Sequence, residues 1–227
     1  MKLLIIRHGN PDYANDTLTE KGWAEARALG ERLKDYRIDA IYTSPLGRAK
    51  DTARPACELL GIEPQVKEWL REFPAGIKTP QHPNGTCPWE MRPLHWSARP
   101  GLCDREEWKV TEPFAESDCP AVFQRIGEGL NELLAEYGYT REGDVYRMDP
   151  ALAPNEKVIA LFCHQGLGLA LFSHIVGLSP AWVWQTMFLP TSSVTEIHME
   201  THEGEPGIAA ARVMNLGDIS HLTKRNF

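Results

Sequence analysis

Short apolar runs alternate with segments of helical periodicity in this chain, most clearly near its two ends. Consecutive apolar residues, as at 158–163, are typical of strands buried on both faces of a sheet. Strict alternation of apolar and polar residues, as at 194–199, is typical of half-buried strands. The pattern predicts strands at 3–6, 38–42, 65–69, 158–163, 194–199 and 211–216, of which 65–69 is the weakest.

Between these strands, apolar residues recur every three or four positions, which is the period of an amphipathic helix. Thr19 is a suitable N-cap for the first helix, and Gly61, Gly138 and Gly177 are suitable stops for later ones. Pro55 lies inside the second helix and predicts a kink or a restart there. Helices are expected at 19–36, 46–60, 122–137 and 167–176.

This order of strands and helices predicts an α/β fold built on a mostly parallel sheet. In such folds the ligand sites lie beyond the carboxyl ends of the strands. His164 directly follows the apolar strand at 158–163, and His8 follows the strand at 3–6 after one residue. Both histidines are therefore expected at that edge.

Residues 73–118 differ from the rest of the chain, because they are rich in proline and show little periodicity. They also contain Trp89, Trp96 and Trp108. One interpretation is a surface insertion that is packed by its own aromatic side chains. The favoured interpretation is a lid over the substrate, because long irregular segments within compact domains usually have a function.

Length and charge narrow the range of partners. The 227 residues suffice for a sizeable core, and we expect one domain, 1–227, that includes the insertion. With 24 Lys and Arg against 31 Asp and Glu, the formal net charge is −7. This balance argues against a general binder of nucleic acids or anionic membranes. A small anionic ligand remains compatible with it, because such a ligand needs only a few well-placed cations.

The cysteines point to a reducing compartment. They are odd in number and include no CxxC pair, so we expect no disulfide framework. A cytoplasmic location is expected instead. The N-terminal segment has only four consecutive apolar residues, too few for a signal peptide, and no segment has the ~18 apolar residues of a membrane helix. The five cysteines are Cys57, Cys87, Cys103, Cys119 and Cys163.

The chemistry-bearing residues gather at the predicted strand ends. Arg7 and His8 follow the first strand, and His164 follows the strand at 158–163. Arg48 lies one turn into the helix that follows residues 43–45. Two imidazoles and two guanidiniums around one point, beside glycine turns, would form a site for a compact oxyanion, since arginine matches phosphate geometry with paired hydrogen bonds.

Five segments of the sequence resemble the motifs of the histidine phosphatase superfamily, also called phosphoglycerate mutase-like. The resemblance covers residues 1–72 and about 155–222, in the family's order and spacing. The segments are 4–9 (LIIRHG, the RHG motif), 18–26 (LTEKGWAEA), 42–53 (YTSPLGRAKDTA), 162–166 (FCHQG) and 215–222 (NLGDISHL).

The resemblance implies a three-layer α/β/α sandwich around a mostly parallel sheet, with the insertion 73–118 after the third strand. It assigns His8 as the nucleophile that becomes a phosphohistidine. It assigns Arg7, Arg48 and His164 to the phosphoryl oxygens and to the charge of the transition state. Such chemistry rests on positioning and electrostatics, so no cofactor and no metal is expected.

The family also places a glutamate after the third strand, and Glu72 matches this position best as general acid and base. Glu68 is the alternative, and a third interpretation has Glu72 merely pairing with a surface cation. Two residues depart from the common pattern. Asn10 stands in the loop that normally contributes a polar side chain to the phosphate, and Gln165 replaces a common glycine and is expected to narrow substrate choice.

A zinc site is a weaker alternative for part of the chain. Cys87, Cys103 and Cys119 lie sixteen residues apart, with His82 and His95 nearby, but structural zinc usually shows closely spaced ligand pairs. The remaining histidines are expected to be structural or at the surface, namely His174, His198, His202 and His221.

These residues support one leading hypothesis and two alternatives. The leading hypothesis is a metal-independent phosphatase for small phosphate monoesters, with a small phosphorylated metabolite as its partner and neither nucleic acid nor membrane. The second is a mutase that moves phosphate between the hydroxyls of a phosphoglycerate. The third is a homologue that binds a phosphorylated ligand without catalysis. Whether the chain forms a homodimer stays open.

Overall fold

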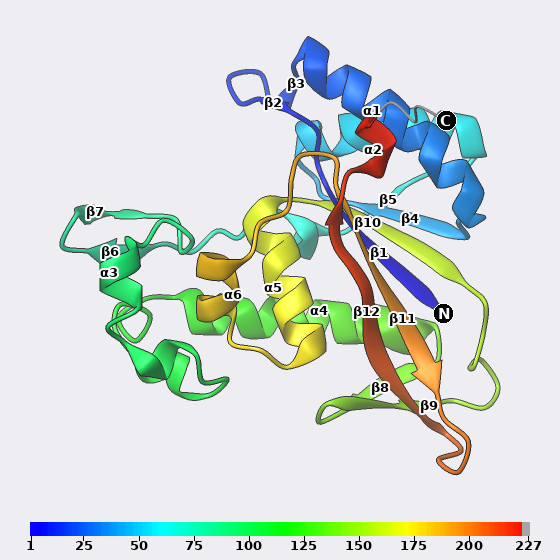
Figure 1. Ribbon diagram of the computed structural model, residues 1–227. Helices are drawn as coiled ribbons and strands as arrows, with labels where there is room; N and C mark the ends of the chain where they lie inside the picture. Colours follow the sequence, from blue (N-terminus) through cyan, green and yellow to red (C-terminus); the bar gives the residue numbers. More distant parts are fainter. Residues whose placement is uncertain (224–227) are drawn as a thin grey trace.

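An eight-stranded sheet with the order β5-β4-β10-β1-β11-β12-β9-β8 forms the centre of the computed structural model, which describes residues 1–223 (Figure 1). The half that carries the predicted site is parallel: β5 (Gln65–Val66), β4 (Ala40–Thr43), β10 (Val158–Cys163) and β1 (Lys2–Arg7). The other half continues the sheet with antiparallel strands: β11 (Val194–Thr201), β12 (Ile208–Asp218), β9 (Val145–Met148) and β8 (Tyr139–Glu142).

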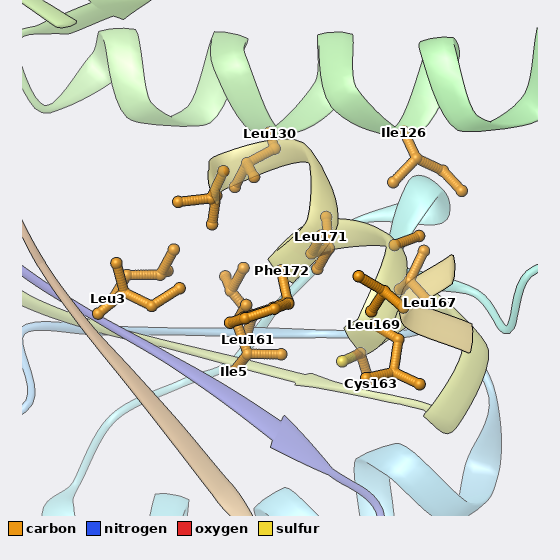
Figure 2. Close-up of a cluster of buried hydrophobic side chains, with 14 of the residues drawn as sticks. Leu3, Ile5, Ile126, Leu130, Leu161, Cys163, Leu167, Leu169, Leu171 and Phe172 are labelled. Atoms are coloured by element: carbon orange, nitrogen blue, oxygen red, sulfur yellow. The ribbon is translucent and has the colours of Figure 1, made fainter. Parts of the chain in front are cut away.

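Helices cover both faces of this sheet, as Figure 1 shows. One face carries α1 (Glu20–Leu33) and α2 (Gly47–Leu60), and the other carries α4 (Cys119–Glu136) and α5 (Gln165–Val176), with α6 (Pro180–Thr186) beside α5. The alternation of side chains along β1 explains the two cores. Leu4 and Ile6 pack under α1 and α2, while Leu3 and Ile5 join Leu161 under α4 and α5 (Figure 2). The predicted three-layer α/β/α fold is confirmed.

Shorter elements connect these layers. A small hairpin of β2 (Pro11–Asp12) and β3 (Thr17–Leu18) follows β1. The insertion contains the hairpin of β6 (Ile77–Thr79) and β7 (His82–Thr86) and the short helix α3 (Pro93–Trp96). Single 3₁₀ turns lie at Lys34–Tyr36, Glu68–Leu70, Pro100–Leu102, Glu107–Val110 and Ser220–Leu222.

The helix α2 runs without a break through Pro55, so the predicted restart there is wrong. Proline removes only the hydrogen bond to the carbonyl of Asp51, and tertiary packing holds the helix at this point. A Cβ atom on Gly30 of α1 would lie 3.2 Å from the backbone of Pro55 and Ala56. The two helices therefore approach closely here, because α1 has no side chain in between.

The insertion is packed onto the core as well as onto itself. Trp108 has no exposed surface, and its ring lies edge-on to Phe114 of the insertion, to Phe123 of α4 and to Trp184 of α6. Residues 73–118 are therefore tied to the layer formed by α4, α5 and α6. Within residues 1–223, no helix is long and apolar enough to cross a membrane.

Trp108→Ala is expected to lower the free energy of unfolding by about 3–5 kcal/mol, because it empties a fully buried aromatic site. Denaturant unfolding measures this loss. Leu94→Ala is the control, since Leu94 lies in the same insertion and is 88% exposed; it should change stability by less than about 0.5 kcal/mol. A loss at Trp108 as small as the loss at Leu94 would contradict this packing.

Candidate functional site

The carboxyl ends of three parallel strands bring the predicted residues together. Arg7 of β1 is paired with Cys163 of β10, so the next residues, His8 and His164, leave the sheet side by side. Their ring centroids are 5.1 Å apart. Ser44, which follows β4, lies on the other side of His164. The edge where the sequence placed an oxyanion site thus contains both histidines.

His8 has the protonation state that a nucleophile requires. Its ring is buried, with 1% of its surface exposed, and Nδ1 lies 2.7 Å from the carbonyl oxygen of Gly9. Because this carbonyl can only accept, Nδ1 carries the proton and Nε2 keeps its lone pair. Burial, helped by the nearby Arg7 and Arg48, lowers the pKa of His8 to about 4, against the hydrogen bond to Gly9, which raises it. The imidazole is therefore neutral at neutral pH.

His164 is held in the complementary state. Its Nε2 lies 2.8 Å from the hydroxyl of Ser44, and that hydroxyl already accepts from the backbone nitrogen of Leu46 at 3.2 Å. The hydroxyl can therefore donate its proton to Nε2, and in that tautomer the proton of His164 lies on Nδ1. Burial, with the proximity of His8 and Arg48, lowers the pKa of His164 to about 2. His164 is thus a neutral hydrogen-bond donor.

Arg7 is fixed by groups from α5 and from the segment after α6. Its Nη1 donates to the carbonyl of Leu189 at 2.5 Å and to Oε1 of Gln165 at 3.0 Å. Oε1 of Gln165 also accepts from the backbone nitrogen of Leu189 at 3.2 Å. Gln165 therefore holds the guanidinium in place, a role that its predicted contact with substrate did not include. The ring of Phe188 lies 5.3 Å from the Arg7 guanidinium.

Arg48 is fixed by Asp16, a residue that the sequence did not single out. Nη1 of Arg48 donates to one carboxylate oxygen of Asp16 at 2.7 Å, and the other oxygen accepts from the backbone nitrogen of Gly47 at 2.7 Å. A Cβ atom at position 47 would lie 2.1 Å from the backbone oxygen of Asp16, so this approach requires glycine. The ring of Tyr13 lies 5.4 Å from the Arg48 guanidinium.

Three buried nitrogen atoms around His8 have no hydrogen-bond partner among residues 1–223: Nε of Arg7, Nε of Arg48 and Nδ1 of His164. Unpaired buried donors are costly, so their presence together calls for an acceptor that the chain does not supply. A tetrahedral oxyanion presents several acceptor oxygens to such a group of donors. Tyr13 and Phe188, which lie against the two arginines, are 69% and 65% exposed.

The carboxylate of Glu72, which follows the 3₁₀ turn Glu68–Leu70, lies against the first turn of α5. Its Oε1 accepts from the backbone nitrogens of Phe73 at 2.8 Å and Leu167 at 2.9 Å. Burial raises the pKa of Glu72 and outweighs these backbone hydrogen bonds, which lower it. A carboxyl group of this kind holds its proton more readily than an ordinary glutamate and can donate it.

Neither alternative for this glutamate fits the geometry. The side chain of Glu68 is 76% exposed and pairs with Arg71 at 3.5 Å, so it points to solvent. Within residues 1–223, Glu72 forms no ion pair, so it is not a partner of a surface cation. It lines a pocket together with Arg7.

Asn10 serves the loop that follows His8. Its side-chain oxygen accepts from the hydroxyl of Thr19 at 2.7 Å, and its backbone nitrogen donates to Glu25 at 2.8 Å. Thr19 is the N-cap of α1, as predicted, because its hydroxyl accepts from the nitrogen of Gly22. Asn10 therefore joins the loop to α1. A direct contact between Asn10 and phosphate stays a prediction. The side-chain nitrogen Nδ2 would make this contact, because the side-chain oxygen and the backbone nitrogen are already paired.

A pocket of about 530 Å³ opens beside Arg7, Glu72 and Gln165, and the insertion contributes Trp89 and Glu90 to its lining. The indole of Trp89 lies against α5, and a Cβ atom on Gly166 would overlap it at 1.9 Å. The amide nitrogen of Gln185 donates to the carbonyl of Pro88 at 2.7 Å, which ties the insertion to α6. The lining residues are Arg7, Tyr13, Glu72, Trp89, Glu90, Gln165, Trp184, Gln185, Thr186, Met187 and Phe188.

The weaker candidates lie apart from this site. In the described part of the chain, no group of three or more His, Cys, Asp or Glu residues is placed to hold a metal ion. All five cysteines are free; Cys87 and Cys103 are exposed, whereas Cys119 is buried. His174 is structural, since its Nε2 lies 3.0 Å from Asn131.

Several residues of the site escaped the sequence analysis. Ser44 and Thr52 lie inside the segment 42–53 but received no role. Thr52 accepts from the backbone nitrogen of Gly9 at 2.9 Å and donates to the carbonyl of Arg48, so it joins two site residues. Asp16 and Phe188 lie in loops without a periodic signal, and only the folded chain shows that they meet the arginines.

Sequence comparisons find relatives of this chain. Residues 3–209 match the sequence profile of the Histidine phosphatase superfamily (branch 1). A protein of Enterobacter sp. (strain 638) named "Probable phosphoglycerate mutase GpmB" is 26% identical over an alignment of 239 positions, gaps included. This alignment covers 98% of this chain and 95% of that protein.

Solved structures share the fold at low sequence identity. A mycobacterial glucosyl-3-phosphoglycerate phosphatase complexed with VO3 superposes with a TM-score of 0.61 at 22% identity, covering 95% of this chain and 97% of that one. A phosphoserine phosphatase from Entamoeba histolytica, in complex with 3-phosphoglyceric acid, has a TM-score of 0.62 at 17% identity, covering 98% and 99%.

Asp16→Ala is expected to weaken the binding of inorganic phosphate by roughly 10-fold to 100-fold, because a hydrogen bond to a charged group contributes about 1.5–3 kcal/mol. Titration calorimetry measures this change without requiring turnover. Asp16→Asn, which keeps an acceptor for Gly47, should lose less. Asp35→Ala, at an exposed position on another part of the surface, is the control. Equal affinities in all four proteins would show that Asp16 does not hold Arg48 for the anion.

Proposed function

Because the chain belongs to branch 1 of the histidine phosphatase superfamily, we propose that it hydrolyses small phosphate monoesters through a phosphohistidine on His8. One observation carries this proposal. A neutral imidazole with a free Nε2 is surrounded by three buried donors without partners, on Arg7, Arg48 and His164. A phosphoryl group fits this arrangement, because its phosphorus can be attacked by Nε2 while its oxygens accept hydrogen bonds from the three donors.

In the first step, Nε2 of His8 attacks phosphorus while the bond to the ester oxygen breaks. Arg7, Arg48 and His164 hold the non-bridging oxygens and stabilise their charge in the transition state. The proton of Glu72 passes to the departing oxygen, so the alcohol leaves neutral. Oε1 of Glu72 is held by backbone nitrogens, so Oε2 is the oxygen that carries this proton.

In the second step, water attacks the phosphorus of the phosphohistidine. Glu72, now ionised, accepts a proton from this water, while the bond between phosphorus and Nε2 breaks. The products are inorganic phosphate, neutral His8 and protonated Glu72, which restores the starting state. The positive charge for both steps comes from the two arginines, so we expect turnover to persist in the presence of a chelator.

Two alternatives stay open. The relative named as a phosphoglycerate mutase favours a mutase, in which the phosphoenzyme returns its phosphate to another hydroxyl instead of to water. The other alternative is a protein that binds a phosphorylated metabolite and does not turn it over. A small phosphorylated metabolite is the partner in each case. A cytoplasmic location, which the five free cysteines favour, belongs to the same proposal.

His8→Ala should abolish both the hydrolysis of p-nitrophenyl phosphate and the acid-labile phosphate that rapid quenching traps on the protein. The measurement is made with a chelator present, beside turnover of 3-phosphoglycerate to its isomer. Hydrolysis that survives in His8→Ala would contradict the mechanism. Isomerisation faster than hydrolysis would establish the mutase, and neither reaction in the wild type would establish the non-catalytic homologue.

Glu72→Gln should lower kcat/KM for an alkyl phosphate by about 10²–10⁴, and for p-nitrophenyl phosphate by less, because nitrophenolate leaves without a proton. The raised pKa of Glu72 keeps it protonated to a higher pH than an ordinary carboxyl group, so the alkaline decline for alkyl esters follows this residue. His8, with its pKa lowered to about 4, limits the rate only on the acid side. Glu68→Gln is the control; equal losses for both esters in Glu72→Gln would remove the acid role.

A further inference from the structure

Apart from the residues already assigned to the phosphoryl end, the lining of the 530 Å³ pocket includes three polar side chains that carry hydrogen-bond acceptors. We call Glu90, Gln185 and Thr186 the acceptor wall. They come from two separate parts of the chain, since Glu90 lies in the insertion, whereas Gln185 and Thr186 end α6. The contact between Gln185 and Pro88 joins these two parts.

Glu90 brings a charge that nothing nearby neutralises. Its side chain is exposed at the pocket, and within residues 1–223 it forms neither an ion pair nor a hydrogen bond. Glu106 of the same insertion differs from it, because Glu106 pairs with Lys109. An unpaired carboxylate in a pocket wall is available to a ligand.

The other two members of the wall also present acceptors. The amide nitrogen of Gln185 gives one of its two hydrogens to the carbonyl of Pro88, whereas its buried Oε1 has no partner in the described part of the chain. The hydroxyl of Thr186 donates to the carbonyl of Trp182 at 2.8 Å, so only its lone pairs remain. A ligand group that donates hydrogen bonds therefore pairs with the carboxylate of Glu90, Oε1 of Gln185 and the lone pairs of Thr186.

The pocket has no cation to spare for a second anionic group. Among residues 1–223, Arg7 is the one cationic side chain in its lining, and Arg7 is already committed to Leu189, Gln165 and the phosphoryl position. A carboxylate on the substrate would face Glu90 without a counter-charge. The two carboxylates would repel each other inside the pocket. Neither could give the other a hydrogen bond, so their oxygens would stay unpaired.

On the basis of the proposed phosphatase function, we propose that the acceptor wall selects phosphate esters whose alcohol part carries hydroxyl or ammonium groups and lacks a carboxylate. Hydroxyl and ammonium groups share the chemistry that the wall requires, because both donate hydrogen bonds. A site built to pair with such donors rejects an analogue that lacks them, since its own polar groups would then stay unpaired. The phosphoryl end is common to all candidates, so selection falls to this wall.

Two matched pairs of esters test this selection by kcat/KM. Glycerol 3-phosphate and 3-phosphoglycerate differ in a hydroxymethyl group against a carboxylate. O-phosphoethanolamine and 2-phosphoglycolate differ in an aminomethyl group against a carboxylate. The donor-bearing ester of each pair is expected to be preferred by about tenfold or more. The better of the two donor-bearing esters identifies whether hydroxyl or ammonium is the natural group.

Glu90→Gln removes the charge and keeps the shape of the side chain. It should raise kcat/KM for the carboxylate esters and lower it for O-phosphoethanolamine, which narrows both ratios. Glu116→Gln is the matched control, because Glu116 is an exposed glutamate of the same insertion and lies outside this pocket. Its ratios should equal those of the wild type.

Carboxylate esters used as well as their partners, within about twofold, would overturn the proposal, as would ratios that Glu90→Gln leaves unchanged. The hydrolysis of p-nitrophenyl phosphate by the same preparations separates this failure from a wider one. If hydrolysis depends on His8 and the ratios are flat, only the acceptor wall is refuted. If no hydrolysis depends on His8, the proposed function itself fails.

Discussion

The parallel pairing of β1 with β10 is the constraint on which the site depends. Its register sets Arg7 opposite Cys163, and the backbone nitrogen of His8 continues the ladder with a 2.9 Å hydrogen bond to the carbonyl of Cys163. Both histidines therefore leave the sheet at the same height. A shift of one residue would turn every side chain of β1 to the opposite face and would exchange the contents of the two cores. The same packing that makes the sheet stable thus fixes the 5.1 Å separation of the two rings.

Around this pair, the protein keeps its imidazoles neutral and its guanidiniums oriented. Burial and the arginines disfavour protonation of His8, so the nucleophile is ready before a ligand arrives. Each arginine is held by a group outside the parallel strands, Arg7 by Gln165 and Arg48 by Asp16. Donors fixed in advance do not have to reorganise as charge develops on a phosphoryl group, which is the usual source of electrostatic catalysis.

The three-layer arrangement followed from the family resemblance, whereas hydrophobic periodicity was sufficient to predict the α/β class and the edge that carries the site. It succeeded because buried strands and amphipathic helices leave a strong pattern, and because parallel strands end at one edge. It failed where tertiary contacts outweigh local preference, as in the unbroken helix at Pro55. It also missed the β8–β9 hairpin, α6 and the anchor Asp16, since short or polar segments carry no period and their partners lie far away in sequence. The role of Gln165 could be seen only once its hydrogen bond to Arg7 was known.

The most direct test is a crystal structure of the protein with orthovanadate, which adopts the geometry of a phosphoryl group under attack. The account predicts vanadium bonded to Nε2 of His8, with vanadate oxygens within hydrogen-bond distance of Arg7, Arg48 and Nδ1 of His164. Vanadium bonded to another residue, or vanadate bound while these three donors stay unpaired, would contradict it.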